Sequence, residues 1–240
     1  MLLYYIRHAD PIYRPDSLTP LGERQSESVA KRLSRYGIDR VFSSSSKRAV
    51  DTSKPLCEML KIELEEAYDW CHESRAIEQL GVFSPERGRN IFGYHHRPTI
   101  ELLISKEAQD LYDNWYDHPY FDGLLFKEGT KRIQKGADDF LEMLGYRHDR
   151  ENFCYYPVSP TDDRIALFAH QGFGLAFMSA ILDIPYSTMC THFYMAHTGV
   201  TVVEFAGTDG PIIPKVLTFS NDSHLYADGL STKFQNRIYI

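Results

Sequence analysis

The chain has 240 residues, of which 43% are hydrophobic and 25% are charged, a composition typical of a globular protein with one sizeable core. Its formal net charge of −7 does not suit a general nucleic-acid binder, because binding to a phosphate backbone depends on clustered lysine and arginine. No segment approaches the roughly 20 consecutive apolar residues that span a bilayer. We therefore expect a cytoplasmic protein with no nucleic-acid or membrane partner, in which any anion site is formed locally.

The N-terminal part of the chain alternates strand and helix signals. Residues 2–6 are an apolar run typical of a buried strand. Thr19 followed by Pro20 predicts an N-cap and the first position of a helix, and Gly37 is a natural end for that helix. A short strand is expected to end at Phe42.

The middle of the chain departs from this alternation. A second helix is expected from about Ser46, with Pro55 kinking it or ending it early. Residues from about 74 to 122 carry scattered proline, glycine and aromatic residues, which we interpret as a mainly helical insertion. A long helix with clear apolar spacing is then expected from about Glu128.

The last third returns to strand and helix. Residues 165–169 predict a strand, which leads into a helix that stops before Pro185. Residues 200–205 and 212–219 predict two further strands, as an antiparallel edge pair. Together these elements predict one domain over residues 1–240, an α/β/α sandwich of three layers with a mostly parallel central sheet. The insertion at about 74–122 is expected near the carboxyl ends of the strands, covering the active site.

Three of the predicted strands run directly into reactive polar groups. Residues 2–6 precede Arg7 and His8, the strand ending at Phe42 precedes a serine run and Arg48, and residues 165–169 precede His170. In open α/β sheets, ligands bind at the carboxyl ends of parallel strands, where side chains far apart in sequence converge. Two arginines and two histidines that meet there suit a phosphate group.

Phosphoryl transfer needs positive donors, an in-line nucleophile and an acid for the departing oxygen. Arg7 and Arg48 each offer a forked donor that matches phosphate oxygens, and the backbone N–H groups of Gln171 and Gly172 at a helix start would add further donors. A neutral His8 imidazole is a competent nucleophile, and His170 would donate to the transferring group. With these cations present we expect no metal ion and no other cofactor.

The same residues lie in motifs that resemble those of the histidine phosphatase superfamily, which has the phosphoglycerate-mutase-like fold. The start resembles the nucleophile motif of that family, the serine run with Arg48 resembles its second phosphate-binding motif, and the segment at His170 resembles its second histidine motif. These three segments are Tyr5-Ile6-Arg7-His8-Ala9-Asp10, Ser43-Ser44-Ser45-Ser46-Lys47-Arg48 and Ala169-His170-Gln171-Gly172. A fourth segment, Leu18-Thr19-Pro20-Leu21-Gly22-Glu23, resembles the helix start that follows the nucleophile motif.

The resemblance implies that His8 becomes transiently phosphorylated and that Arg7, Arg48 and His170 bind the phosphoryl group. It also implies a carboxylate that protonates the leaving group. Glu73, in a position similar to the family's acidic element, is our choice, with Asp69 and Glu78 as alternatives.

The chain departs from the family pattern after the first histidine. Ala9, Asp10 and Pro11 follow it, and Tyr13 and Arg14 occupy the region where mutases of the family carry a substrate-binding asparagine loop. We therefore expect Tyr13 and Arg14 to bind substrate, and we favour hydrolysis of a small phosphomonoester. Two alternatives stay open: a cofactor-dependent phosphoglycerate-type mutase, and a catalytically weak relative that binds phosphorylated ligands or proteins.

Overall fold

A computed structural model describes residues 1–232 of the chain. The strands are β1 (Leu2–Arg7), β2 (Pro11–Tyr13), β3 (Asp16–Leu18), β4 (Arg40–Ser44), β5 (Leu64–Tyr68), β6 (Gly81–Ser84), β7 (Arg89–Phe92), β8 (Tyr146–Asp149), β9 (Cys154–Pro157), β10 (Arg164–Ala169), β11 (Val200–Glu204) and β12 (Lys215–Asn221). The α-helices are α1 (Pro20–Ser34), α2 (Lys47–Leu60), α3 (Glu73–Gln79), α4 (Arg97–Leu103), α5 (Lys106–Asp110), α6 (Phe126–Met143), α7 (Gln171–Leu182), α8 (Tyr186–His192) and α9 (Ser223–Ala227). Three short 3-10 helices are η1 (Gly93–His95), η2 (Tyr112–Asp117) and η3 (Pro119–Phe121).

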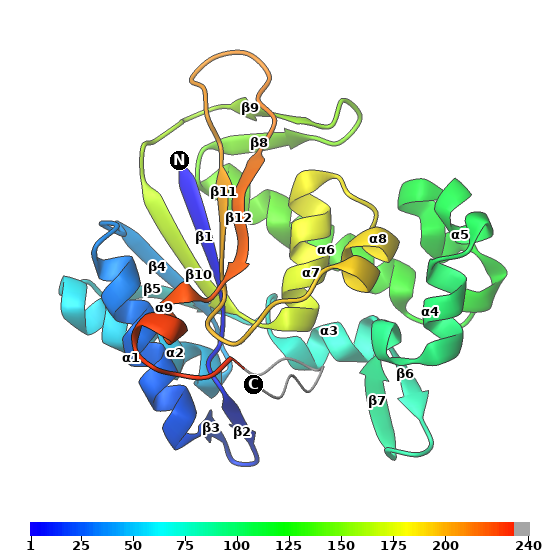
Figure 1. The fold of residues 1–240 in the computed structure, drawn as a ribbon. Helices are drawn as coiled ribbons and strands as arrows, with labels where there is room; N and C mark the ends of the chain where they lie inside the picture. The colour runs from blue at the N-terminus through cyan, green and yellow to red at the C-terminus, as the bar shows by residue number, and fades with distance from the viewer. Residues whose placement is uncertain (233–240) are drawn as a thin grey trace.

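The centre of the molecule is a six-stranded sheet in the order β12-β11-β1-β10-β4-β5 (Figure 1). Strands β1, β10, β4 and β5 pair in parallel, and β11 and β12 complete one edge in antiparallel fashion. The mostly parallel sheet and the antiparallel pair at its edge confirm the expected fold class. Strand β5 was not predicted, because its charged sequence, Leu-Glu-Glu-Ala-Tyr, lacks an apolar run.

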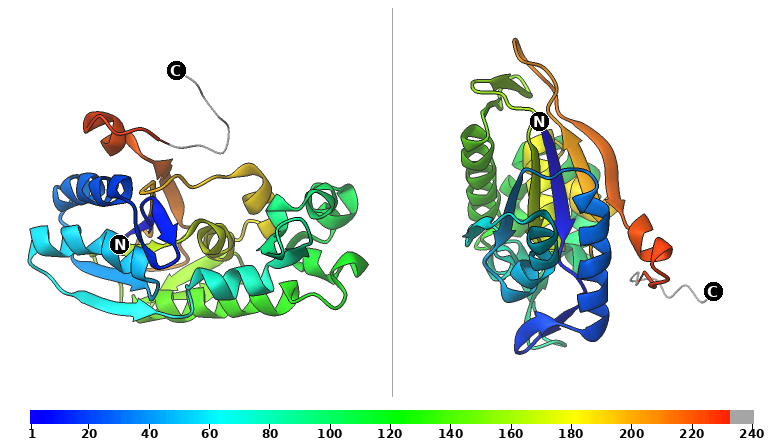
Figure 2. Two further views of the ribbon diagram at one scale, coloured as in Figure 1. Left: turned by 90° about the horizontal axis from the view of Figure 1, so that it is seen from below. Right: turned by 90° about the vertical axis from the view of Figure 1, so that its left-hand side faces the viewer.

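Helices cover both faces of this sheet, because alternate residues of each strand point to opposite sides. Tyr4 and Ile6 of β1 pack in one apolar cluster with residues of α1, whereas Leu3 and Tyr5 belong to a second cluster with residues of α6 and α7. Viewed from below, α1 and α6 lie on opposite sides of the sheet (Figure 2). The three-layer arrangement is therefore built by the strand periodicity of the sequence.

Two local predictions for helices have different outcomes. Thr19 caps α1 as expected, because its hydroxyl accepts a hydrogen bond from the Gly22 N–H at 3.0 Å. Pro55 was expected to kink the second helix or to end it early, and the early end is wrong, since α2 continues to Leu60 with Pro55 inside it. Of the helices in residues 1–232, none has the length and apolar character needed to cross a membrane.

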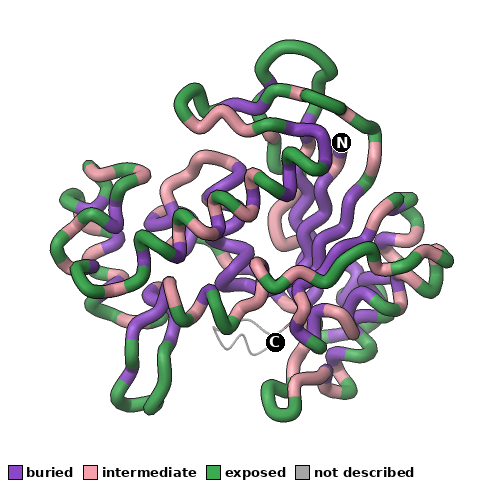
Figure 3. Tube along the Cα trace, turned by 180° about the vertical axis from the view of Figure 1, so that it is seen from behind, coloured by how far each residue is buried: buried purple, intermediate pink, exposed green. Residues whose placement is uncertain are grey.

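The segment from 74 to 122 contains helices, as expected, and also the β6–β7 hairpin, which the sequence analysis missed. Helices α4 and α5 lie beyond α8 at one end of the molecule, while the hairpin extends on the side where β1 ends (Figure 1). The tip of the hairpin is exposed, in contrast to the buried central strands of the sheet (Figure 3). Trp115 of this segment is 1% exposed and belongs to the main apolar cluster, so its role is packing.

Candidate active site

The parallel register of β1 and β10 places the two histidines side by side. Arg7 pairs with Ala169 in this register, so His8 and His170 follow at the same edge of the sheet. The centroids of their rings are 5.2 Å apart. Strand β4 lies on the other side of β10 and leads through Ser46 into α2, which carries Arg48. The predicted convergence of these strand ends is present in the structure.

Two guanidinium groups are buried at this edge. Arg7 and Arg48 are only 9% and 7% exposed. Arg7 Nη1 donates to Gln171 Oε1 at 2.8 Å and to the Met195 carbonyl at 2.6 Å, which fixes the orientation of the fork. The Nε atoms of both arginines are buried without a hydrogen-bond partner in residues 1–232. Buried donors without partners are costly, and an anion bound between them would satisfy them.

The hydrogen bonds of His8 leave one ring nitrogen available. Its Nδ1 lies 2.7 Å from the Ala9 carbonyl, which accepts only from an N–H, so the proton is on Nδ1. Its Nε2 is buried, has no hydrogen-bond partner in the described chain and therefore carries a lone pair. Burial, followed by the charges of His170 and Arg7, lowers the pKa of His8 well below its ordinary value. A neutral imidazole with a free Nε2 is the form required of a nucleophile.

His170 is fully buried and held by side chains from three elements. Its Nε2 lies 2.8 Å from Ser44 Oγ, and its Nδ1 lies 3.2 Å from Arg48 Nη2 and 3.3 Å from Glu73 Oε2. Burial lowers the pKa of His170, and the Glu73 carboxylate opposes this effect. Because Nδ1 faces both a donor and an acceptor, the ring fits its surroundings in either protonation state.

Glu73, at the start of α3, is the only one of the three candidate carboxylates that reaches these groups. Burial alone would raise its pKa, but the charges of His170, Arg7 and Arg48 outweigh this and lower the pKa to about 2. Asp69 is exposed and accepts a hydrogen bond from Ser45, and Glu78 is exposed on the same helix. The geometry therefore favours Glu73 over the two alternatives.

The structure modifies the expectation for the start of α7. The Gly172 N–H, predicted as a phosphate donor, donates to Glu73 Oε1 at 2.9 Å and thereby orients that carboxylate. Gln171 contributes its side chain, which accepts from Arg7. A side chain at position 172 would collide with Phe92, since an added Cβ would lie 2.1 Å from its ring. Glycine thus permits the β6–β7 hairpin to close against α7.

A cavity of about 390 Å³ is lined at one end by Arg7, Arg48, Glu73 and Gln171. Tyr13 and Tyr194 lie beside the two arginines, with ring centroids 5.5 Å from Arg48 Cζ and 6.0 Å from Arg7 Cζ. Arg14 lies outside the cavity lining, so the β2–β3 hairpin contributes Tyr13 alone. The lining residues are Arg7, Tyr13, Arg48, His72, Glu73, Ser74, Ile77, Arg87, Arg89, Asn90, Ile91, Phe92, Tyr94, His95, Gln171 and Tyr194.

Some of these residues were not singled out from the sequence. Tyr194 lies in a loop before β11, and Arg87 and Arg89 belong to the unpredicted hairpin. His197 lies near the nucleophile, with its ring centroid 5.6 Å from that of His8 and its Nδ1 3.6 Å from Asp10 Oδ1. No local pattern in the sequence places Tyr194, Arg87 and Arg89 at a cavity, because tertiary packing brings them there.

The site also contains a set of possible metal ligands. One ligand atom from each of His8, Glu73 and His170 lies within 4.8 Å of the others. The guanidinium groups of Arg7 and Arg48 border the same space, and two permanent positive charges there disfavour a further cation and favour an anion. We therefore still expect an anion and no metal ion.

A parallel α/β sheet whose strand ends hold two buried arginines, two histidines and one carboxylate defines a class of enzyme that acts on phosphate esters. Residues 3–71 match the model of the histidine phosphatase superfamily (branch 1). The match includes Arg7, His8 and Arg48, and it supports a phosphatase that is similar to this superfamily over these residues.

Individual proteins of known name are similar over most of the chain. The "Putative phosphoserine phosphatase 2" of Hydrogenobacter thermophilus is 23% identical over 220 residues, which cover 88% of this chain and 93% of that protein. A phosphoserine phosphatase mutant from Entamoeba histolytica, solved with phosphoserine, superposes with a TM-score of 0.59 at 17% identity and covers 93% of this chain and 98% of its own. A mycobacterial glucosyl-3-phosphoglycerate phosphatase, solved with VO3, superposes with a TM-score of 0.58 at 16% identity and covers 91% of this chain and 98% of its own. At these identities the structural matches support the fold.

Proposed function

We propose that this protein is a metal-independent phosphomonoesterase that hydrolyses a small phosphorylated metabolite through a phosphohistidine on His8. The observation that carries the proposal is a set of three buried nitrogen atoms, His8 Nε2 and the Nε atoms of Arg7 and Arg48, which have no hydrogen-bond partner within residues 1–232. One is a nucleophile and two are donors, which is the complement of a phosphoryl group.

In the first step, the lone pair on His8 Nε2 attacks phosphorus and the bond from phosphorus to the ester oxygen breaks. Arg7, Arg48 and His170 stabilise the negative charge on the phosphoryl oxygens. The departing oxygen takes a proton from Glu73, and the alcohol leaves. The Ala9 carbonyl accepts from Nδ1–H at 2.7 Å throughout and stabilises the positive charge that develops on the ring.

In the second step, water attacks phosphorus and the bond to Nε2 breaks. The Glu73 carboxylate, now deprotonated, takes a proton from the water, and inorganic phosphate leaves with the water oxygen as its fourth oxygen. The hydrogen bond that the Gly172 N–H donates to Glu73 holds this carboxylate in place for both proton transfers. The cycle returns His8 to its neutral form and uses no metal ion.

We also propose that residues 74–122 are an insertion in a single domain and form the cover of the site. Six cavity-lining residues from Arg87 to Tyr94, together with Ser74, Ile77 and His95, come from this segment, which supports the proposal. The names of the relatives refer to phosphoserine and glucosyl-3-phosphoglycerate, both small phosphorylated compounds, and this supports a small-molecule substrate.

The test is phosphate release from p-nitrophenyl phosphate and a panel of metabolite phosphomonoesters, with EDTA present. We expect metal-independent release by the wild type and loss of at least about a thousandfold in His8→Ala. His192→Ala, at an exposed histidine in α8, is the matched control. A radiolabelled phosphoryl group that survives base and is lost in acid should appear on the wild type alone. Full activity in folded His8→Ala would refute the proposal, and transfer within a sugar-acid phosphate without release would indicate a mutase.

A further inference from the structure

The loop between α8 and β11, residues 193–199, holds Arg7 in the phosphoryl site. The Met195 carbonyl accepts from Arg7 Nη1 at 2.6 Å. Farther along the loop, the Thr198 N–H donates to the Arg7 carbonyl at 3.0 Å, and the Gly199 carbonyl accepts from the Arg7 N–H at 3.4 Å. Both the main chain and the guanidinium group of Arg7 therefore depend on the position of this loop.

The loop has a backbone conformation that needs support from its surroundings. Thr198 adopts a φ of 55°, in the left-handed region that β-branched residues rarely occupy. Such a conformation persists only where neighbouring contacts hold it. Thr198 is buried, and its hydroxyl donates to the His197 carbonyl at 2.7 Å. A hydroxyl has one proton, so Thr198 Oγ1 must be the acceptor in any second hydrogen bond.

His224, in α9, supplies this second hydrogen bond. Its Nε2 lies 3.0 Å from Thr198 Oγ1 and, since that oxygen accepts, carries the proton. Its Nδ1 lies 3.4 Å from Arg32 Nη1, which can only donate, so this nitrogen has the lone pair. Burial, followed by the charge of Arg32, lowers the pKa of His224 to about 4, and the ring is neutral at pH 7. Both neighbours thus require the same tautomer.

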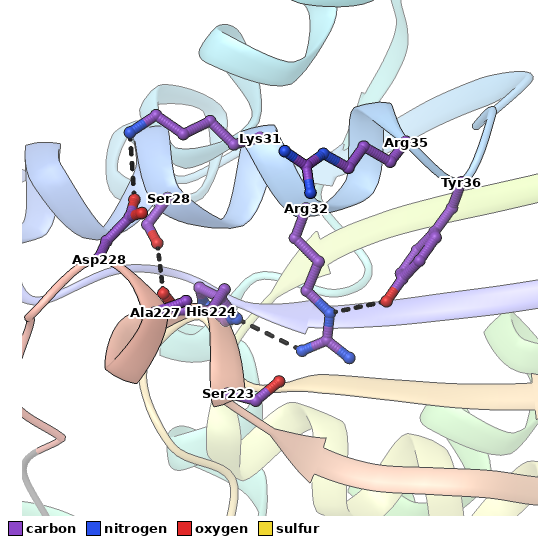
Figure 4. A pocket seen from close by; sticks show the side chains of 9 residues that line it. All are labelled: Ser28, Lys31, Arg32, Arg35, Tyr36, Ser223, His224, Ala227 and Asp228. Carbon is purple, nitrogen blue, oxygen red and sulfur yellow. Dashed lines mark hydrogen bonds and ion pairs between the residues drawn. The ribbon is translucent and has the colours of Figure 1, made fainter.

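The outer end of this chain of hydrogen bonds lies in a pocket of about 380 Å³ between α1 and α9 (Figure 4). Arg32 donates there to the carbonyl and side-chain oxygens of Asn221, at 2.9 and 2.7 Å. Its Nε donates to the Tyr36 hydroxyl at 3.2 Å (Figure 4). Ser28 Oγ donates to the His224 carbonyl at 3.0 Å. These contacts fix Arg32 and α9 against α1, and they keep His224 within reach of the loop.

We propose that His224 and Thr198 are positioning residues that align Arg7 with the phosphoryl group. The hydrogen bonds run in one direction, from Arg32 to His224, from His224 to Thr198 and from Thr198 to the loop backbone. Buried hydrogen bonds arranged in such a chain polarise and strengthen one another. The inference rests on the proposed binding of the phosphoryl group by Arg7, and it assigns the contact of α1 and α9 with the loop to phosphoryl recognition.

The test replaces His224 by two amides that imitate different parts of its ring. The amide nitrogen of glutamine reaches about as far as Nε2, so His224→Gln can still donate to Thr198, whereas asparagine reaches only as far as Nδ1. A misplacement of about 1 Å can cost about a hundredfold in rate. We therefore expect kcat/KM to fall by about ten- to a hundredfold in His224→Asn and by less than about threefold in His224→Gln. The loss should be equal for aryl and alkyl phosphates, because Arg7 binds the group that both share.

A second pair of variants separates the hydroxyl of Thr198 from its shape. Thr198→Ser keeps the hydroxyl and should retain most of the activity. Thr198→Val keeps the branched shape without the hydroxyl, and its kcat/KM should fall by about tenfold or more. A role in packing alone predicts the reverse order, and that result would overturn the inference.

His148→Asn is the matched control, because His148 is also a buried histidine with two hydrogen-bonded partners but does not line the cavity. It should lower the free energy of unfolding and leave kcat/KM of the folded protein unchanged. Equal kcat/KM in His224→Asn and His224→Gln would overturn the inference and leave the proposed function intact.

Calorimetric titration with inorganic phosphate gives a readout without turnover. We expect phosphate to bind more weakly to His224→Asn than to His224→Gln, and amide hydrogen exchange in residues 193–199 to be faster in His224→Asn. The same order of binding and exchange, in a protein whose wild type releases no phosphate from any compound, would support the inference and contradict the proposed function. Unchanged binding and exchange in His224→Asn would overturn the inference.

Discussion

Replacement of Glu73 by glutamine tests whether this residue protonates the leaving group. In the free site the pKa of Glu73 is about 2, because the positive charges of His170, Arg7 and Arg48 lower it by more than burial raises it. Protonating it at pH 7 would then cost about 7 kcal/mol, at about 1.4 kcal/mol for each pKa unit. A bound phosphoryl dianion offsets the two arginine charges, so we expect the pKa of Glu73 to rise in the complex and the acid to form only with substrate bound.

The expected loss depends on the leaving group. A positioned general acid contributes about 10²- to 10⁴-fold, so kcat/KM of Glu73→Gln should fall by that factor for an alkyl phosphate such as glycerol 1-phosphate. For p-nitrophenyl phosphate, whose leaving group needs no proton, the fall should be below about tenfold. The parameter kcat/KM includes steps only up to departure of the alcohol, so later hydrolysis of the phosphohistidine does not affect it.

The matched control is Glu78→Gln, at an exposed carboxylate on the same helix. It should leave both substrates unchanged, and Asp69→Asn should do the same. Equal losses for the alkyl and aryl substrates in Glu73→Gln would refute the role in protonation and would indicate that Glu73 positions His170. A selective loss in Asp69→Asn would transfer the role to that residue.

Three further predictions concern the framework. Gly172→Ala should destabilise the protein by about 1–3 kcal/mol, measured by urea denaturation, because the added Cβ would lie 2.1 Å from Phe92; an unchanged midpoint would contradict this. Thr19→Ala should cost about 1 kcal/mol through loss of the cap on Gly22, whereas Thr19→Ser should keep most of it. Burial lowers the pKa of His148, but hydrogen bonds to Asp138 and Asp183 at 3.0 Å raise it overall. The stabilisation of the folded protein by protonated His148 is therefore complete below about pH 6.5 and is lost as the pH rises through the raised pKa. His148→Gln should abolish this pH dependence of the free energy of unfolding, and His192→Gln should retain it.

The sheet and its strand ends were predictable because local signals and topology agree. The apolar runs before Arg7 and His170 are unmistakable strands, and parallel pairing then requires the two histidines to be neighbours. Thr19 and Pro20 likewise place a helix start through local chemistry alone. Strand β5 was missed because its solvent-facing glutamates hide the periodicity of an edge strand.

The residues of the outer part of the site were harder to predict from local sequence signals. The β6–β7 hairpin is held by contacts with other elements, including the packing of Phe92 against Gly172, and these contacts join residues 80 positions apart in the chain. Its turn, Pro85-Glu86-Arg87-Gly88, has the residues of a tight turn, and Gly88 adopts a φ of 58°. The turn signal was present in the sequence, but the strands beside it are only four residues long and carry no clear alternation.

Glu73 was harder to select from the sequence than the two histidines, because its position depends on contacts with other parts of the fold. His8 and His170 extend directly from central strands, so the register fixes them. Glu73 begins a helix after a loop, and three contacts from elsewhere select it: the Gly172 N–H, His170 Nδ1 and Arg48 Nη2, at 2.9, 3.3 and 3.7 Å. Two of these groups, His170 and Arg48, also bind the phosphoryl group in our proposal. The contacts of Glu73 with the anion site therefore distinguish it from Asp69 and Glu78, and these contacts form only in the folded protein.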